Sequence, residues 1–503
     1  MKRANNGRAR IAALLLATIF GSAPAFAADL RIGLREDPDI LDPHEARTFV
    51  GRIVFNALCD KLVDTDAKLQ FVPRIATSWT FADDGKTMTM KIREGAKFHD
   101  GTALDAAAVK ANIERAQTLQ TSRRKSELTS VASIEAPDAT TVVFRLKAPD
   151  APLLAQLSDR AGMLLSPKSF DKPVGPSPVC SGPYKFVERV QNDRTVLARF
   201  AEHWEADKYA FDTVTFRVIP DETVRLANLR SGQLDMMERM AASDVKSARA
   251  DAALKVLTIP GLGYQAININ VGNGDRSKSP LGQDKRVRQA LSLAIDREAL
   301  NQVVFEGLFA PTGQPYPPAS PYHDESYPAP KRDLAKAKEL LKAAGAEGIS
   351  FEMQVSNSTV EQQVGQVIQA MAAEAGIDIK IKSTEFATML KAQSAGDYQS
   401  TRVGWSGRVD PDGNIHQFVT TGGGINDTKF FNPDVDKALN AARLIYDVAL
   451  RKKLYMDAEK VLRDELPIIY MYHEAWIWGL SAKLSGFVPN PDGMIRLAGM
   501  KIN

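Results

Sequence analysis

Apolar residues in the C-terminal half of the chain alternate between two periods. Every second position from 349 to 355 is apolar, which predicts a strand, and from 360 to 371 apolar residues recur every three or four positions, which predicts a helix. The alternation returns over 377–381, so this region predicts a strand–helix–strand unit with parallel strands and a right-handed crossover. A helix over 386–393 and a strand over 398–403 extend the predicted open α/β sheet.

The segment that follows the last of these strands, residues 404–414, combines chain-breaking residues with chemically varied side chains. Three glycines and one proline interrupt regular structure, and between them lie an indole, a guanidinium, two carboxylates and an amide. Because ligands bind at the carboxyl ends of strands in open α/β sheets, we predict a binding loop for a small zwitterionic solute. The predicted ligand-binding residues are Gly404, Trp405, Arg408, Asp410, Asp412 and Asn414.

Two alternatives stay open for this segment on composition alone. Asp410 and Asp412 are typical turn residues, so the segment could be an ordinary solvated loop. The indole of Trp405 could equally belong to the hydrophobic core.

The N-terminal half is also mixed in its periodicity. Alternating apolar residues predict strands over 30–34, 88–92, 141–146, 184–190, 195–200 and 214–218, and helical spacing predicts helices over 47–58, 106–115 and 223–229. With 503 residues in total, the chain is long enough for two or three domains. A short basic run, Arg123–Lys125, is typical of a solvated face, with anion binding as the alternative.

The first 27 residues have the composition of a signal peptide. Residues 1–10 carry four Lys or Arg and no acidic residue, residues 11–20 are largely apolar, and Ala25 and Ala27 form an A-x-A cleavage motif. The apolar run is too short to span a membrane. We therefore expect cleavage near Ala27 and a periplasmic location for the remainder of the chain.

Removing this leader changes the charge balance. The formal charge of the whole chain is +3, but 60 Lys or Arg and 61 Asp or Glu residues remain after residue 27, because all four charged residues of the leader are basic. A nucleic-acid-binding protein normally shows a basic excess, so we expect no nucleic-acid partner.

The chain has two cysteines, Cys59 and Cys180. In an exported protein they are expected to form a disulfide, which would stabilise the fold by ~4–5 kcal/mol because it closes a long loop; two buried thiols are the alternative. We expect no metal site, because the six histidines are scattered and residues 410–414 resemble a calcium loop only superficially. We expect no cofactor and no enzymatic activity, because the chain contains neither a nucleophile elbow nor a phosphate-binding loop.

Several motifs together resemble one known family. They are the segments 76–79, 83–86, 92–95, 98–102, 108–110, 181–184, 287–291 and 294–297. On these motifs the chain resembles the solute-binding proteins of ABC importers, family 5, which bind peptides, nickel complexes and related solutes. The resemblance covers the whole chain after the leader.

The resemblance implies an α/β fold with two lobes, an extra subdomain in lobe I and two hinge crossings. The implied ranges are 28–64, 176–268 and 481–503 for lobe I, 65–175 for the extra subdomain and 269–480 for lobe II, with crossings near 266–271 and 479–482. It also implies a monomer that closes over its ligand and docks on an ABC permease at the inner membrane.

The family's peptide binders carry an aspartate three residues after the tryptophan of the Gly-Trp motif, where this chain has Arg408. An arginine favours a carboxylate or phosphate. The main prediction is therefore a binder of a small peptide or peptide-like solute, in which Trp405 stacks, Arg408 anchors an acid and Asp410 or Asp412 anchors an amine. The alternatives are a binder of another anionic solute (an opine, a glutathione-like compound or a sugar-phosphate conjugate), a chemoreceptor partner without transport, and a secreted hydrolase.

Overall fold

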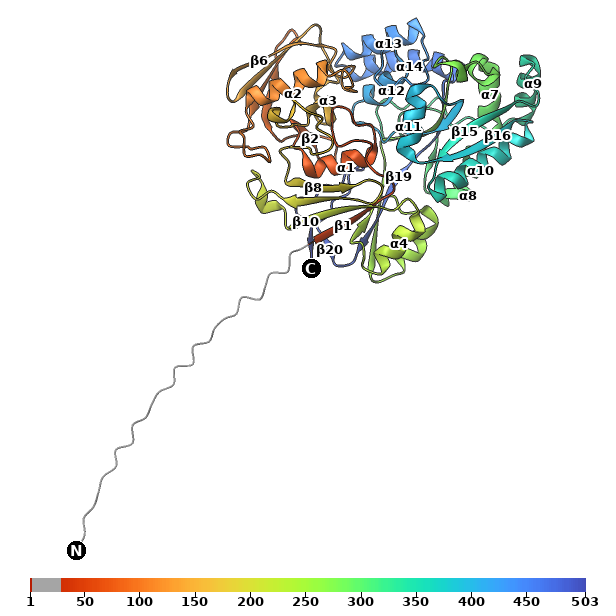
Figure 1. Ribbon diagram of the computed structural model, residues 1–503. Coiled ribbons are helices and arrows are strands. Elements are labelled where there is room, and N and C mark those ends of the chain that lie inside the picture. The colour runs from red at the N-terminus through yellow and green to blue at the C-terminus, as the bar shows by residue number, and fades with distance from the viewer. Residues whose placement is uncertain (2–28) are drawn as a thin grey trace.

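Two large sheets form the centres of two lobes in the computed structural model (Figure 1), which describes Met1 and residues 29–503. The predicted signal peptide lies outside the described residues. The sheet of lobe I has the order β12-β19-β11-β1-β10-β9-β8. Its strands are β1 (Asp29–Leu34), β8 (Tyr184–Val190), β9 (Arg194–Arg199), β10 (Thr213–Val218), β11 (Met236–Met237), β12 (Leu254–Pro260) and β19 (Ala475–Ser481).

The sheet of lobe II contains the unit predicted from the alternating periods. Its order is β14-β18-β13-β17-β15-β16, and its strands are β13 (Gln265–Ile269), β14 (Ala310–Pro311), β15 (Ser350–Ser356), β16 (Asp378–Thr384), β17 (Ser400–Arg402) and β18 (Ile468–His473). Strand β15 runs parallel to both β16 and β17, so the prediction of parallel strands is confirmed. The last strand is shorter than the predicted range 398–403.

Helices cover the sheet of lobe II. They are α7 (Lys285–Ala294), α8 (Arg297–Phe305), α9 (Leu334–Ala344), α10 (Thr359–Glu374) and α11 (Phe386–Ala395). The apolar stripe of α10 is buried through Val364, Ile368 and Ala372, and it packs in one hydrophobic core with Met353 and Val355 of β15. This core therefore fixes the edge at which β15 and β17 end.

The extra subdomain is a four-stranded antiparallel sheet of order β4-β5-β7-β6. It consists of β4 (Ala76–Phe81), β5 (Thr87–Ile92), β6 (Val131–Asp138) and β7 (Thr141–Leu146), with α2 (Ala106–Thr118) and α3 (Leu153–Leu157). The side chain of Asp105 caps α2 by accepting a hydrogen bond from the backbone N–H of Ala108 at 2.9 Å. Figure 1 shows this subdomain (orange) next to helices α12 (Asp412–Val419), α13 (Pro433–Arg443) and α14 (Val448–Glu465) of lobe II.

The chain passes between the two large sheets twice, but at positions that differ from the expected ones. It leaves the sheet of lobe I after Pro260, at the end of β12, and enters the other sheet at Gln265; it returns between His473 and Ala475. The expected crossings near 266–271 and 479–482 lie inside or just after paired strands, because β13 pairs with β17 and β18, and β19 pairs with β12. Alternating apolar residues identify a strand but not the sheet that it joins.

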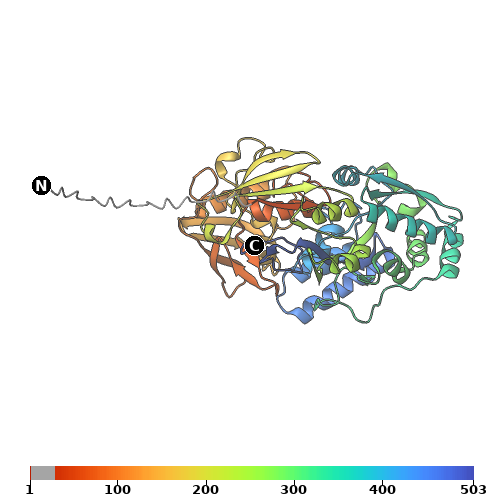
Figure 2. The same cartoon turned by 90° about the horizontal axis from the view of Figure 1, so that it is seen from below.

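Other contacts tie the N- and C-terminal parts of the chain into lobe I. Helix α1 (Phe49–Leu58) precedes Cys59, which forms a disulfide with Cys180. The C-terminal strands β20 (Leu484–Ser485) and β21 (Lys501–Ile502) pair with each other. Figure 2 shows the C-terminus in the same lobe as the first strand, with the helices and strands of residues 334–384 (teal) in the opposite lobe. Within residues 29–503, no helix combines the length and the apolar character needed to cross a membrane.

Candidate ligand-binding site

A large cavity lies between the two lobes and is lined from both sides. Its empty volume is about 1040 Å³, including solvent at its mouth. Lobe I supplies Arg47 and Phe49, and lobe II supplies Ser356 and Gly404. Ser356 is the last residue of β15, and Gly404 follows β17 by two residues. The cavity, hereafter the main cleft, therefore lies at the carboxyl ends of parallel strands, where the sequence placed the binding loop.

Trp405 forms part of the wall of the main cleft. Its backbone exchanges two hydrogen bonds with Tyr264, at 2.9 and 2.8 Å, and its indole N–H donates to Asn414 Oδ1 at 3.2 Å. The ring packs edge-on against Phe418 with the ring centroids 4.9 Å apart. Gly404 permits this arrangement, because a Cβ atom there would lie 2.5 Å from the carbonyl oxygen of Tyr264. The indole is half-buried and rigidly held, which suits a surface against which a solute packs.

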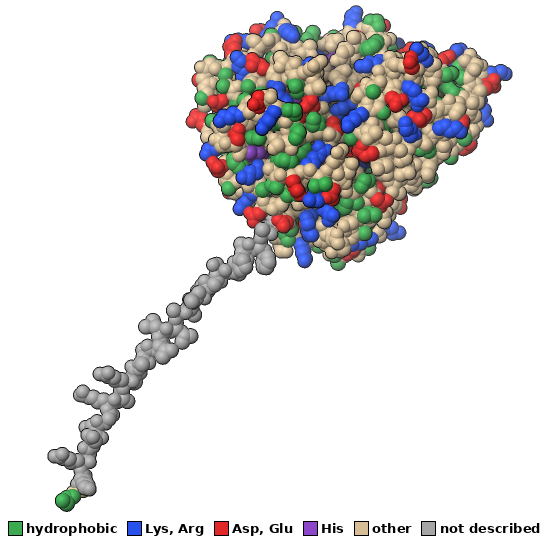
Figure 3. Space-filling model, viewed as in Figure 1, with side chains coloured by type: hydrophobic (Ala, Val, Ile, Leu, Met, Phe, Trp, Pro, Cys, Tyr) green, Lys and Arg blue, Asp and Glu red, His purple; other side chains and the backbone are tan. Residues whose placement is uncertain are grey.

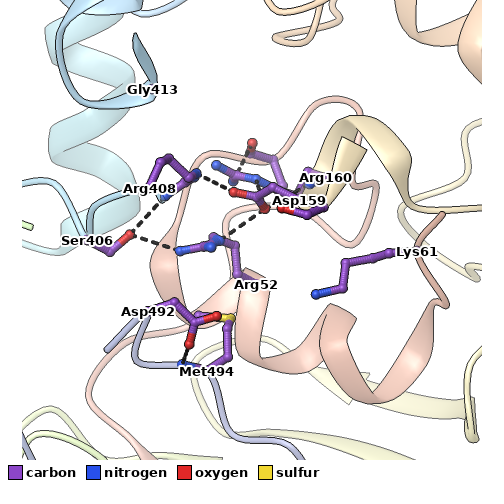
Figure 4. A network of polar contacts seen from close by, with 12 residues as sticks. Arg52, Lys61, Asp159, Arg160, Ser406, Arg408, Gly413, Asp492 and Met494 are labelled. Carbon is purple, nitrogen blue, oxygen red and sulfur yellow. Dashed lines mark hydrogen bonds and ion pairs between the residues drawn. The ribbon is translucent and has the colours of Figure 1, made fainter. Parts of the chain in front are cut away.

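Arg408, predicted to face the solute, is instead engaged by the protein (Figure 4). Its Nε forms a short ion pair with Asp159 of lobe I, and its guanidinium lies over the ring of Trp405, 4.1 Å from the centroid. Arg52 pairs with the same carboxylate at 3.1 Å. Arg52 and Arg408 also both donate to Ser406 Oγ, at 3.2 and 3.3 Å. Because Arg408 belongs to lobe II, these contacts join the two lobes beside the main cleft.

The two predicted amine-binding carboxylates are also paired. Asp410 accepts two hydrogen bonds from Arg451, at 2.9 and 2.8 Å, and Asp412 lies 3.0 Å from Arg443. Both line a second cavity, with an empty volume of about 440 Å³, between the subdomain and lobe II. Asp410 also accepts the backbone N–H of Asp412 at 3.0 Å, which is the turn geometry given above as the alternative.

Asn414 holds the loop closed upon itself. Its Oδ1 accepts the backbone N–H of Arg408 at 2.7 Å, and its Nδ2 donates to the carbonyl oxygen of Arg408 at 3.0 Å. Of the six predicted residues, the structure thus places Gly404 and Trp405 on the main cleft and gives Arg408 and Asn414 contacts that position the loop.

The electrostatics around Asp159 are dominated by arginines. Burial opposes ionisation of Asp159, but the guanidinium groups of Arg408, Arg52 and Arg160 outweigh it and hold the pKa of this carboxyl well below its usual range. Burial lowers the pKa of Arg160 to about 9, with the neighbouring charge of Arg124 acting in the same direction. The arginines around Asp159 thus place positive charge in a region where there is little solvent to screen it.

Further contacts cross between the lobes around the rim of the main cleft. Arg47 of lobe I forms an ion pair with Asp427 of lobe II at 2.7 Å. Arg443 of lobe II donates to the carbonyl oxygen of Ser126 in the subdomain at 3.2 Å. The described arrangement is therefore one in which the lobes are closed over the cleft.

Sequence reasoning missed the residues that lobe I and the subdomain contribute to the cleft. The sequence favours a solvated face for the basic run that contains Arg124, with anion binding as the alternative; the solvated face is wrong for Arg124, which is only 2% exposed and lines the main cleft. Its position beside two other cationic residues was the available signal. Arg47 and Arg160 carried no local signal, because isolated arginines are common on helices and turns. No group of three or more His, Cys, Asp or Glu side chains in the described part of the chain is arranged to hold a metal ion.

Two lobes with a charged cleft between them are the arrangement of proteins that bind a solute between closing domains. The family model of the bacterial extracellular solute-binding proteins, family 5 (middle), matches residues 70–426. The chain belongs to this family, which provides the solute-binding components of ABC importers.

Similarity to known proteins over nearly the whole chain supports the assignment to this family. The glutathione-binding protein GsiB of Escherichia coli (strain K12) is 30% identical over 502 residues, which cover 96% of this chain and 97% of the relative. GsiB of Pectobacterium atrosepticum is 29% identical over 498 residues, covering 96% of each chain.

Solved structures share the fold. The ABC transporter-associated periplasmic binding protein DppA of Helicobacter pylori, in complex with the peptide STSA, has a TM-score of 0.87 at 23% identity and covers 95% of this chain and 98% of its own. The binding protein AgaA of A. tumefacien R10, in complex with agropinic acid, has a TM-score of 0.86 at 26% identity, with 94% and 99% covered. The predicted two-lobed fold with an extra subdomain is confirmed.

Proposed function

We propose that this protein captures a small, acidic peptide or peptide-like solute between its lobes in the periplasm and delivers it, as a monomer and without chemical turnover, to an ABC permease at the inner membrane. The main cleft carries this proposal. It is lined from both lobes, and its lining combines the indole of Trp405 with several arginines.

The ion pairs of the loop refine the roles expected from the sequence. Arg408, Asp410 and Asp412 each have a protein partner of opposite charge. Breaking such a buried pair is costly, so we assign these residues to holding the loop and the closed form, and we assign direct contact with the solute to Trp405. Closure requires contacts that the open form lacks, and the pair between Arg408 and Asp159 is one of them.

The similarity to GsiB favours glutathione or a related acidic peptide as the solute. A second candidate is an opine-like acid, favoured by the 26% identity to AgaA, whose structure holds agropinic acid. Both candidates are anionic, in agreement with the arginines of the cleft.

Native mass spectrometry of the purified protein tests the proposal. We expect a co-purified solute of a few hundred daltons, or a complex on addition of glutathione or short acidic peptides. A protein that carries no solute and forms no complex with peptides or opines would contradict it. Mass spectrometry of the peptides after prolonged incubation should find them intact; cleaved products would support the hydrolase alternative.

A further inference from the structure

One side chain borders both the main cleft and the second cavity, which lies between the subdomain and lobe II. It is Gln417 of helix α12, a residue that the linings of the two cavities share. Gln417 is 6% exposed. The next residue, Phe418, packs edge-on against the indole of Trp405 with the ring centroids 4.9 Å apart. The two cavities therefore meet at Gln417, next to the ring that we assign to contact with the solute.

The side chain of Gln417 is weakly held in this position. Its Nε2 donates to the carbonyl oxygen of Gly413 at 3.0 Å, one turn earlier in the same helix, and this is the one hydrogen bond of the side chain within residues 29–503. A bond of this kind contributes little net stability, because water replaces it when it breaks. The amide of Gln417 can therefore move aside without breaking a contact between the lobes.

Other side chains between the two cavities are fixed in ion pairs. Arg124 lines the main cleft and pairs with Glu127, which lines the second cavity. Arg408 lines the second cavity and points toward its partner Asp159 (Figure 4). Breaking a buried ion pair is costly, so these residues stay in place. Gln417 is therefore the part of this partition that opens most readily.

The second cavity offers no unpaired charge to a ligand. Besides the two pairs above, its lining contains Asp410, which pairs with Arg451 at 2.8 Å, and Asp412, which pairs with Arg443 at 3.0 Å. Burial lowers the pKa of His416, so this ring is uncharged at neutral pH. The outer surface is different, because charged side chains of both signs face solvent over the face shown in Figure 3. A charged solute group in the second cavity would lack a partner, whereas an uncharged group needs none.

We infer that the second cavity is a side pocket for an uncharged group of the solute, and that Gln417 is the gate through which this group enters. Pro152 and Ala155 supply apolar surface for such a group on the subdomain side. Gln417 is then a specificity-determining residue, because the space that its side chain leaves decides how large a group passes. The inference deepens the proposed function and rests on it.

Titration calorimetry with matched tripeptides tests the inference. The reference is Ala-Ala-Glu, and norleucine or lysine replaces the first or the second alanine, so that chains of similar length end in a methyl or an ammonium group. In the native protein one norleucine peptide should bind about tenfold more tightly than its lysine counterpart, because the ammonium has no partner in the side pocket. Gln417→Ala should raise the affinity for that norleucine peptide, relative to the reference, about fourfold for each further methylene buried. Gln417→Phe fills the opening and should lower this ratio.

The reference peptide separates a role in selection from a role in folding, because a merely structural change weakens all the peptides alike. Gln363→Ala, which replaces an exposed glutamine of α10 in the same lobe, is the matched control and should keep the native ratios. The inference is overturned by a norleucine-to-reference ratio that is the same in both Gln417 variants as in the native protein, or by a lysine peptide that binds as tightly as its norleucine counterpart.

If the native protein binds none of these peptides and no glutathione, the proposed peptide function fails instead. The co-purified solute then decides the inference: weaker binding of that solute by Gln417→Phe supports the side pocket, and an unchanged affinity overturns it.

Discussion

Replacing Arg408 by alanine should weaken solute binding, although Arg408 makes its contacts with the protein. Its ion pair with Asp159 joins lobe II to lobe I and therefore belongs to the closed form. After the replacement, Asp159 keeps Arg52 as a partner at 3.1 Å, so the carboxylate is not left as an uncompensated buried charge. The loss is then that of one charge-assisted hydrogen bond, about 1.5–3 kcal/mol, rather than the larger cost of stranding a buried ion.

A loss of this size in the closed form alone corresponds to a decrease in affinity of roughly 10- to 150-fold. Titration calorimetry with the co-purified solute or with glutathione measures it, and thermal unfolding of the solute-free variant shows whether the open form is affected. Arg145→Ala removes an exposed arginine paired with Glu135 and should leave the affinity unchanged. An affinity of Arg408→Ala within about twofold of the native value would refute the reasoning, because that pair would then contribute little to closure.

Three further outcomes concern stability. Replacing Cys59 and Cys180 by serine opens a loop of 121 residues and should lower the free energy of unfolding by ~4–5 kcal/mol, measured by denaturant titration; an unchanged midpoint would contradict this. Burial raises the pKa of Asp150 to about 6, so the folded protein holds the proton more tightly than the unfolded chain, whose Asp titrates near ~4. The native protein should therefore lose stability relative to Asp150→Asn as the pH rises from about 4 to about 6, and parallel stability–pH curves would argue against it. Gly404→Ala should destabilise the protein by about 1–3 kcal/mol and weaken binding, because its Cβ would lie 2.5 Å from a backbone oxygen; native thermal stability would show that the loop adapts.

Local patterns were sufficient to predict much of lobe II. The apolar periods of residues 349–381 identified β15, α10 and β16. The order of these elements also placed Trp405 at a strand end, which is how the sequence located one wall of the cleft.

The partners of the charged residues could not be predicted in the same way. Arg408 and Asp159 are separated by 249 positions, and Arg47 and Asp427 by 380. A charge on a loop carries no sign of whether its partner is a solute or a distant part of the same chain. The predicted positions of the crossings between the lobes differ from the observed ones for a related reason. The pairing of β19 with β12 depends on tertiary contacts and not on the alternation within either strand.

Hydrogen–deuterium exchange with and without the solute tests the central claim, that both lobes close over a guest in the main cleft. We predict slower exchange on both walls at once, in the backbone around Tyr264 and Trp405 on one side and around Arg47 and Phe49 on the other. Protection confined to one lobe, or located away from these residues, would contradict the claim.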